Sequence, residues 1–336
     1  MAKPFEVETN RPKAGPLPAE GLAKGGSAPD SAAYKLRFFL AVLWARPAFA
    51  IGYLIVILVC LVALLAPWIA PYPPEVANPA DYLQPPSSAH WLGTDSTGMD
   101  IFSRIIFAPR YDLTIALVAT FLSAIIGSAL GSIVGYYQES RGLSSALAAF
   151  VIRAADVIQA FPFFVFAIAV VAVIGQSIQS VILAIAFVNI PIYLRLMRSQ
   201  VLAVRRMRYV EAAYIAGVSD LGIMLRHVIP NSMAPVLAHL SVNIGWSVLL
   251  AAGLSFVGAG VEAPTPEWGL MIAMGFQSIV TGQWWPSVFP GVALALTVAG
   301  FSLVGASVEV LSDPVRRRVL AGSIGRQSLS NSPARS

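Results

Sequence analysis

Residues 208–231 have the sequence RYVEAAYIAGVSDLGIMLRHVIPN, and runs too apolar for a soluble protein flank them on both sides. In the first half, small and apolar residues recur at the spacing i, i+3, i+4 and i+7, which predicts a short helix with one apolar face. The four positions are Val210, Ala213, Tyr214 and Gly217. The small side chains of Ala212 and Ala216 permit another protein to approach closely. We therefore interpret the stretch as a docking surface held against a membrane.

The second half of this stretch predicts a turn and another short helix. The turn begins at Gly217, and Ser219 or Asp220 is expected to cap the helix that follows, over residues 221–228. Pro230 is expected to end that helix, because proline has no backbone N–H group to donate.

The composition indicates an integral membrane protein. Hydrophobic residues make up 57% of the 336 residues and charged residues only 12%, against about a quarter charged in soluble domains. A helix needs about 20 apolar residues to cross a bilayer, where every backbone group must find its partner within the helix. Six runs meet this need: 49–70, 113–136, 157–175, 178–195, 235–261 and 287–310. The predicted fold is therefore all-α, with six transmembrane helices.

The positions of lysine and arginine predict the orientation, because these residues are retained on the cytoplasmic side. With six spans and both termini cytoplasmic, only two of the 22 lysine and arginine residues, Arg104 and Arg110, lie on the side of the membrane opposite the cytoplasm. Residues 208–231 are then cytoplasmic. The net charge of +5 requires no nucleic acid, because basic loops beside spans also meet anionic lipid headgroups. We expect membrane lipid, and no nucleic acid, as a partner.

No motif in the sequence predicts a catalytic, metal or nucleotide site. A P-loop requires the pattern G-x-x-x-x-G-K-[ST], whereas all four lysines precede the first span. They are Lys3, Lys13, Lys24 and Lys35. The three histidines are isolated from one another and from any HExxH pattern. If transport is driven by ATP, the nucleotide must sit on a partner that acts on residues 211–230.

Five residues in or beside the spans are candidates for a gate or translocation path. Arg153 and Asp156 are spaced i, i+3 and could pair on one helix face, either as a gate or as an ion pair at the lipid headgroups. Asn189 and Asn243 lie within spans, where a polar group is expensive and faces a helix interface or an aqueous path. The fifth candidate is Ser255, within the fifth span.

Ser255 also raises the alternative of an intramembrane protease, whose serine nucleophile needs a positioned base. His239 lies on the same predicted helix but about 24 Å away at 1.5 Å per residue. That distance excludes activation of the hydroxyl, so packing between helices is the favoured role for Ser255.

Residues 211–231 begin with EAA, continue after three residues with Gly217, and end after nine more with HVIPN. This pattern resembles the EAA loop of permease subunits of bacterial ATP-binding-cassette importers. With that resemblance, coupling to an ATPase is expected from Tyr209, Glu211, Ala212, Ala213, Tyr214, Gly217 and Asp220. Support of the loop is expected from Arg208, Arg226, Pro230 and Asn231.

Three further segments resemble the second permease of dipeptide, oligopeptide and nickel importers, the DppC and OppC group. Residues 90–104, HWLGTDSTGMDIFSR, are similar to the family pattern HWLGTDxxGRDxxSR, with Met99 in place of the usual arginine. Residues 153–162 are similar to RxxDxxxAFP, and residues 254–269 to LSFLGLGVQPPTPEWG. The resemblance covers about residues 35–315.

The resemblance implies a type I importer permease fold in the bacterial inner membrane, with both termini cytoplasmic. The expected segments are a disordered cytoplasmic tail at 1–33, a first transmembrane helix with a periplasmic loop at 34–95, a five-helix permease core at 96–312 that contains the coupling loop 205–232, and a cytoplasmic tail at 313–336. The expected partners are a homologous permease of the DppB or OppB type, two cytoplasmic ATPases that hold ATP and magnesium, and a periplasmic solute-binding protein. The chain itself is then expected to bind no cofactor and to catalyse no reaction.

Di- and oligopeptides are the expected cargo, while nickel, opines and glutathione stay open within the same family. The outer loops at 72–110 and 262–285 are expected to receive the binding protein, and their acidic bias predicts docking that weakens with salt. A secondary transporter is the alternative from another class, although it needs ionisable groups near mid-span. A membrane scaffold is a further alternative, but it would not need the EAA spacing.

Overall fold

The computed structural model of the chain describes residues 32–139 and 142–312. In that part of the chain the regular structure is helical apart from one isolated β-bridge between Thr94 and Asp100. Six helical segments are long and apolar enough to span a membrane: Pro47–Ile69, Ile101–Tyr137, Leu143–Ala160, Ile178–Arg205, Asp220–Phe256 and Trp285–Leu311. The prediction of an all-α protein with six spans is confirmed. The predicted tail at 313–336 and all but the last two residues of the predicted tail at 1–33 lie outside the described residues.

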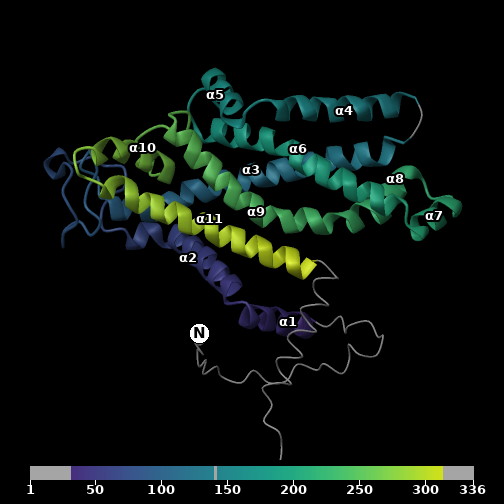
Figure 1. The fold of residues 1–336 in the computed structure, drawn as a ribbon, viewed down its shortest axis with the longest axis horizontal. Coiled ribbons are helices and arrows are strands. Elements are labelled where there is room, and N and C mark those ends of the chain that lie inside the picture. Colours follow the sequence, from purple (N-terminus) through teal and green to yellow (C-terminus); the bar gives the residue numbers. More distant parts are fainter. Residues whose placement is uncertain (1–31, 140–141, 313–336) are drawn as a thin grey trace, which may run out of the picture. The chain divides into compact units, whose positions relative to one another are not determined.

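Residues 48–312 form one compact unit, and α1 (Ala32–Ala45) belongs to a separate one. The helices that follow α1 are α2 (Pro47–Ile69), the 3-10 turn η2 (Pro79–Asp81), α3 (Ile101–Tyr137), α4 (Leu143–Ala160), α5 (Phe163–Ile174), α6 (Ile178–Arg205), α7 (Arg208–Ile215), α8 (Asp220–Ile223), the π-helical turn η3 (Met224–Val228), α9 (Ile229–Phe256), α10 (Trp268–Ile279) and α11 (Trp285–Ser312). Within the 48–312 unit, α7 and α8 lie at one end and α10 at the opposite end (Figure 1). We call these the α7 end and the α10 end.

The central helix of the unit is α3, whose 37 residues extend about 55 Å at 1.5 Å per residue. It begins after Asp100, whose carboxylate accepts a hydrogen bond from the Ser103 N–H at 2.8 Å and so caps the first turn. Since the hydrocarbon core of a bilayer is about 30 Å thick, α3 is long enough to reach beyond it and connect the two ends of the unit.

Three glycines let α3 approach α6 at backbone contact distance. Gly127, Gly131 and Gly135 are spaced four residues apart, and a β-carbon on any of them would overlap α6 atoms. Small residues at this spacing are the usual means of close packing between membrane helices. The same device joins α11 to its neighbours, with Gly305 against α9 and Gly300 against α2. The core of the unit is therefore a tight bundle of α3, α6, α9 and α11.

The predicted third span at 157–175 is wrong, because the helix breaks at Pro162. Phe161 has the extended conformation that a following proline imposes, with φ −82° and ψ 137°. The apolar run is therefore divided between the end of α4 and the short helix α5. The helix long enough to span a membrane is α4, which starts at Leu143, fourteen residues before the predicted start.

The predicted stop at Pro230 is also wrong. Asp220–Ile223 passes through the π-helical turn η3 directly into α9, and the whole segment to Phe256 is one helical run. Pro230 directly follows the π-helical turn, in which the Ile229 N–H donates to the Met224 carbonyl oxygen five residues back, and the helical run continues through the proline into α9. At the other end of the short helix the prediction agrees with the structure, since the Ser219 hydroxyl accepts the Gly222 N–H at 3.3 Å.

The predicted loop at 262–285 contains the helix α10, which the sequence prediction missed. Glu267 caps it, since its two carboxylate oxygens accept the N–H groups of Gly269 and Leu270 at 3.0 and 2.7 Å. With 12 residues, α10 is too short to cross a bilayer, which needs about 20.

Candidate functional site

The predicted coupling loop lies at the α7 end and exposes large apolar side chains. Tyr214 and Ile215 are 69% and 79% exposed. Around them are further exposed residues from the predicted coupling set: Tyr209, Glu211, Ala212, Gly217 and Asp220. Exposed apolar side chains gathered in one place mark a surface on which another molecule packs.

The opposite face of α7 packs against the chain itself. Val210 is 5% exposed and belongs to a core cluster that includes Met197, Ile223 and Val228, and Ala213 packs against the same cluster. The interpretation of Val210 and Ala213 as part of an outward apolar face is therefore wrong. A helix of eight residues has two sides, and here the inward side holds α7 in place while the outward side is left open.

Two polar contacts attach this segment to the end of α3. The Tyr136 hydroxyl donates to the Asp220 carboxylate at 2.9 Å. Arg205 at the end of α6 donates to the Tyr136 carbonyl oxygen at 2.7 Å, and its guanidinium lies 5.1 Å from the centre of the Tyr136 ring. The sequence prediction named Asp220 but missed Tyr136 and Arg205, because neither lies within the EAA pattern.

Gly217 ends α7 with a backbone conformation that other residues rarely adopt. Its φ is +78°, and a β-carbon there would have no heavy atom within 4 Å. The backbone conformation therefore favours glycine at this position. Neighbouring atoms of the chain would leave room for a larger side chain. Gly217 donates its N–H to the Tyr214 carbonyl oxygen at 3.0 Å, and Val218 donates to Ala213 at 3.2 Å, which closes the turn.

The four predicted support residues are all exposed around this segment: Arg208, Arg226, Pro230 and Asn231. Arg208 begins α7, and Arg226 lies in η3. Asn231 donates its side-chain amide to the His227 carbonyl oxygen at 2.6 Å. That bond reinforces the joint between η3 and α9.

Asp156 does not pair with Arg153, and that part of the prediction is wrong. Its carboxylate instead accepts a hydrogen bond from Arg195 of α6 at 2.8 Å, in a pair whose side chains are nearly half exposed. The pairing therefore joins α4 to α6. Arg153 is exposed on α4.

Asn189 and Asn243 meet inside the helix bundle. The Asn189 amide nitrogen donates to the Asn243 side-chain oxygen and to the Ser247 hydroxyl, both at 3.4 Å. Thr120 of α3 donates to the same Asn243 oxygen at 3.2 Å. Both asparagines are at most 2% exposed, so the cluster joins α3, α6 and α9 by polar contacts within an apolar bundle.

Ser255 lies at the α10 end, beside two buried carboxyl groups. These are Glu267 and Asp112 of α3, both fully buried, and the Trp268 N–H donates to the Asp112 carboxylate at 3.3 Å. Burial raises the pKa of Glu267 above its ordinary value, while hydrogen bonds from Asp112, the backbone of Leu270 and Gly269, and Ser255 oppose the rise. The sequence prediction missed this pair, although a carboxylate within an apolar run, such as Asp112, is itself a signal.

Arg104 is fully buried and holds the α10 end together. Its guanidinium donates to the carbonyl oxygens of Pro74 at 2.9 Å and Pro264 at 3.1 Å, and lies 3.7 Å from the Asp95 carboxylate. Three segments far apart in the sequence thus meet on one side chain. Met99 is buried with its sulfur 2.8 Å from an Arg104 nitrogen.

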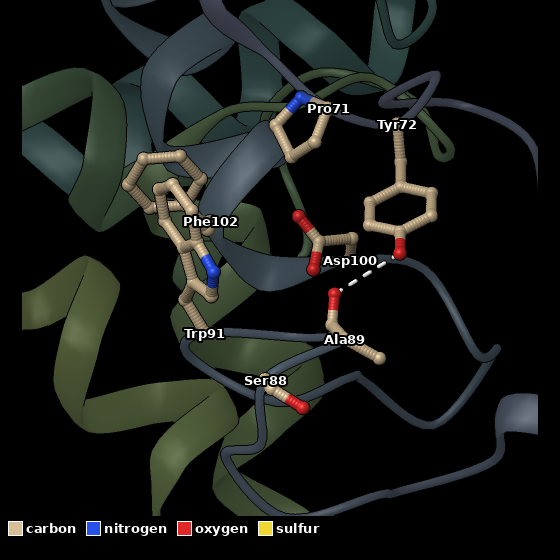
Figure 2. A pocket seen from close by; sticks show the side chains of 7 residues that line it. All are labelled: Pro71, Tyr72, Ser88, Ala89, Trp91, Asp100 and Phe102. Carbon is tan, nitrogen blue, oxygen red and sulfur yellow. Dashed lines mark hydrogen bonds between the residues drawn. The ribbon is translucent and has the colours of Figure 1, made fainter.

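A pocket of about 200 Å³ opens at the same end (Figure 2). Trp91 and Phe102 form one wall, with ring centres 4.7 Å apart, and Tyr72 forms the other. Asp100 lies between the two walls, and its carboxylate is 2.9 Å from the His90 ring nitrogen Nδ1. The pocket combines exposed aromatic surface, including the 61% exposed Trp91, with a nearby carboxylate.

Two sequence models of known families match the chain. One is described as the binding-protein-dependent transport system inner membrane component and matches residues 127–318; the other is the N-terminal TM domain of oligopeptide transport permease C and matches residues 38–86. Together they cover both the first span and the predicted coupling loop.

Curated relatives match most of the chain. The "Probable D,D-dipeptide transport system permease protein DdpC" of Escherichia coli K12 is 37% identical over 81% of this chain and 89% of its own length. The dipeptide permease DppC of Alkalihalophilus pseudofirmus is 38% identical over 79% and 84%. The glutathione permease GsiD of Escherichia coli O6:K15:H31 is 40% identical over 78% and 84%. These matches confirm the resemblance to DppC and OppC permeases, and the chain belongs to the binding-protein-dependent transport system inner membrane components, multi-pass permease subunits of the bacterial inner membrane.

Proposed function

We propose that this chain is one of two permease subunits in an ATP-driven importer of peptides. Two of the three named relatives are permeases of dipeptide transport systems, and the third transports glutathione, itself a peptide. Among the six spans of this chain, the apolar windows of α2 and α4 are only 11% buried. Such open faces leave room for a homologous permease as well as for lipid.

The observation that carries the proposal is the exposed face of α7. Tyr214 and Ile215 present apolar surface, while Val210 on the other face is buried in the chain's own core. A helix with one face fixed and the other free is suited to fit a groove on a partner protein. We assign that groove to a cytoplasmic ATPase, since the chain has no P-loop of its own.

Movement of the ATPase can then pass into the membrane through the contacts at the base of α7. Asp220 is bonded to Tyr136 of α3, and Arg205 of α6 is bonded to the same tyrosine. A displacement of α7 therefore acts on α3 and α6 together. Because these two helices are packed at backbone distance through their glycines, they move as a rigid body, and access alternates across the bilayer.

In this arrangement the α7 end and both termini are cytoplasmic, and the α10 end faces the periplasm. The solute-binding protein then docks on the α10 end, where Trp91, Glu75 and Glu262 are exposed, whereas Asp95 and Asp100 in the same region are buried. The buried contacts of Arg104 make this end a rigid landing surface.

The test is reconstitution in liposomes. The chain is purified with its partner permease and two ATPases, the binding protein is added outside, and uptake of radiolabelled alanyl-alanine is followed. Uptake that needs both ATP and the binding protein supports the proposal. Accumulation of the peptide by this chain alone, driven by a proton or sodium gradient, would overturn it in favour of a secondary transporter. Glutathione is the second candidate cargo because of the 40% identity to GsiD, and labelled glutathione tests it in the same assay.

A further inference from the structure

A groove of about 310 Å³ lies between the end of α4, α6 and α9. We call it the α4–α6–α9 groove. Its walls include the aromatic side chains of Phe161, Phe163 and Trp246 and the side-chain amides of Gln159 and Asn189. Among all the side chains that line it, none is ionisable. The groove exists because Pro162 ends α4 and turns the chain into α5 at this point.

Hydrogen bonds through its nitrogen fix the orientation of the Asn189 amide, so its oxygen is the atom available to bind a ligand. Its nitrogen donates to Asn243 and Ser247, deep in the bundle. Since the Asn243 oxygen can only accept, the group that faces it must be the Asn189 nitrogen. Among the described residues, none donates to the Asn189 oxygen, although the side chain is only 1% exposed and lines the groove. An acceptor that is left open at the wall of a groove is available to a ligand that supplies a donor.

Two further groups on the groove wall are open to hydrogen bonding. Gln159 and Trp246 are exposed, and neither makes a side-chain hydrogen bond with the described residues. The wall thus offers an acceptor at Asn189, a donor at the Trp246 indole, and both at Gln159. A peptide backbone presents the matching set, since each unit carries one N–H donor and one C=O acceptor.

Two charged residues that flank the groove along α4 and α6 are paired with each other. Asp156 lies three residues before Gln159 on α4, and Arg195 lies six residues after Asn189 on α6. They form an ion pair at 2.8 Å. The groove therefore has no charged group of its own to select peptide termini or charged side chains, and what it can recognise is the neutral amide.

We infer that the α4–α6–α9 groove is a transit site for the amide backbone of the cargo, in which the Asn189 oxygen accepts a peptide N–H and Asn243 and Ser247 hold that amide in position. The inference rests on the proposed function, because it takes the cargo to be a peptide. It predicts that this subunit transports peptides with different side chains, because the groove contacts the backbone that all of them share.

The experiment uses the complete transporter in liposomes and two probes, alanyl-alanine and its ester analogue alanyl-lactate, which lacks the amide N–H. The binding protein is the same throughout, so its own preference cancels when variants are compared. One hydrogen bond is worth about 1 kcal/mol, so Asn189→Leu is expected to lower the amide-to-ester uptake ratio about fivefold. The matched control Leu183→Ala, at an exposed position of α6 that does not line the groove, is expected to keep the ratio. An equal loss of both probes in Asn189→Leu would show a merely structural role and overturn the inference.

A second measurement covers the case in which Asn189→Leu folds poorly. Gln159→Cys is made in a Cys60→Ser background and labelled with N-ethylmaleimide. Alanyl-alanine under turnover is expected to slow the labelling about threefold or more, while Leu147→Cys, exposed elsewhere on α4, is labelled at an unchanged rate. If alanyl-alanine does not slow the labelling of Gln159→Cys, the groove holds lipid or the partner permease instead of cargo. Failure of the wild-type transporter to take up alanyl-alanine would instead count against the proposed function.

Discussion

At one end of α3 the guanidinium of Arg104 is fully buried and bonded to the chain's own carbonyl groups, whereas at the other end Tyr136 supports a helix whose Tyr214 and Ile215 are mostly exposed. Arg104 and Tyr136 are 32 residues apart on one helix, about 48 Å at 1.5 Å per residue. At the α10 end the chain's own carbonyl groups hold the buried guanidinium, while the α7 end keeps apolar surface open. In the proposed function, the first arrangement serves transient docking of the binding protein, and the second is the interface proposed for the ATPase.

Removal of Arg104 is expected to have the largest effect on stability. Arg104→Ala leaves the Asp95 carboxylate without its cation and the carbonyl oxygens of Pro74 and Pro264 without a donor. Breaking a buried ion pair costs about 3–5 kcal/mol, so thermal unfolding in detergent should shift strongly downwards. The matched control is Arg110→Ala on the same helix, where the side chain is exposed. If both variants unfold alike, the α10 end is not held by Arg104.

The two faces of α7 are expected to respond in opposite ways. Tyr214→Ala removes an exposed side chain, so stability should change by no more than about 0.5 kcal/mol. Loss of an aromatic anchor typically costs about 2 kcal/mol of binding, which lowers affinity for the ATPase roughly 30-fold. Val210→Ala should instead destabilise the chain by about 1.5–3 kcal/mol, because this side chain is buried. Pull-down of the ATPase and thermal unfolding separate the two, and retention of the ATPase by Tyr214→Ala would contradict the assignment.

Substitutions at Gly217 are expected to separate backbone strain from surface shape. Gly217→Ala should cost about 1 kcal/mol through the left-handed conformation alone, since a β-carbon meets no neighbour. Gly217→Asn should cost less, because asparagine tolerates positive φ. Gly217→Leu adds bulk to the exposed face and should uncouple ATP hydrolysis from uptake while insertion into the membrane continues. Normal uptake and normal ATP hydrolysis in Gly217→Leu would show that this turn does not serve coupling.

The α7 end could be predicted from the sequence better than the α10 end, and the difference has a physical reason. The spans and the α7 helix follow from local apolar patterns, and the EAA spacing alone is enough to locate the exposed segment. Pro162 was a local signal as well, but the apolar run across it concealed the break. The contacts of Arg104, in contrast, join positions 74, 95 and 264, and no pattern along the chain shows such a meeting.

The same holds for Asp112 and Glu267. They are 155 positions apart in the sequence, and the packing of α3 against the start of α10 brings them to one place, where the Trp268 N–H donates to Asp112. The cluster of Asn189 and Asn243 could be predicted in part. Its residues were recognisable as polar groups within spans, yet the direction in which the Asn189 amide points depends on tertiary contacts with Asn243 and Ser247.

The smallest expected effect is a change in how stability depends on pH, confined to the α10 end. Burial raises the pKa of Glu267 above its ordinary value, which is about 4.3 in an unfolded chain. The folded state therefore holds this proton more tightly than the unfolded state does. Stability is expected to fall as pH rises from that ordinary value through the raised one, and to level off above it.

Glu267→Gln tests this dependence with little change in shape. Glutamine carries no titrating proton, and its side-chain oxygen can still accept from Gly269 or Leu270 at the start of α10. Thermal unfolding between pH 4 and about 8 should therefore lose part of its slope in the variant. The matched variant Glu211→Gln changes an exposed carboxylate at the α7 end and should leave the slope unaltered. A slope that persists in Glu267→Gln would place the responsible proton on another group, and Glu267 would then not account for the pH dependence of the α10 end.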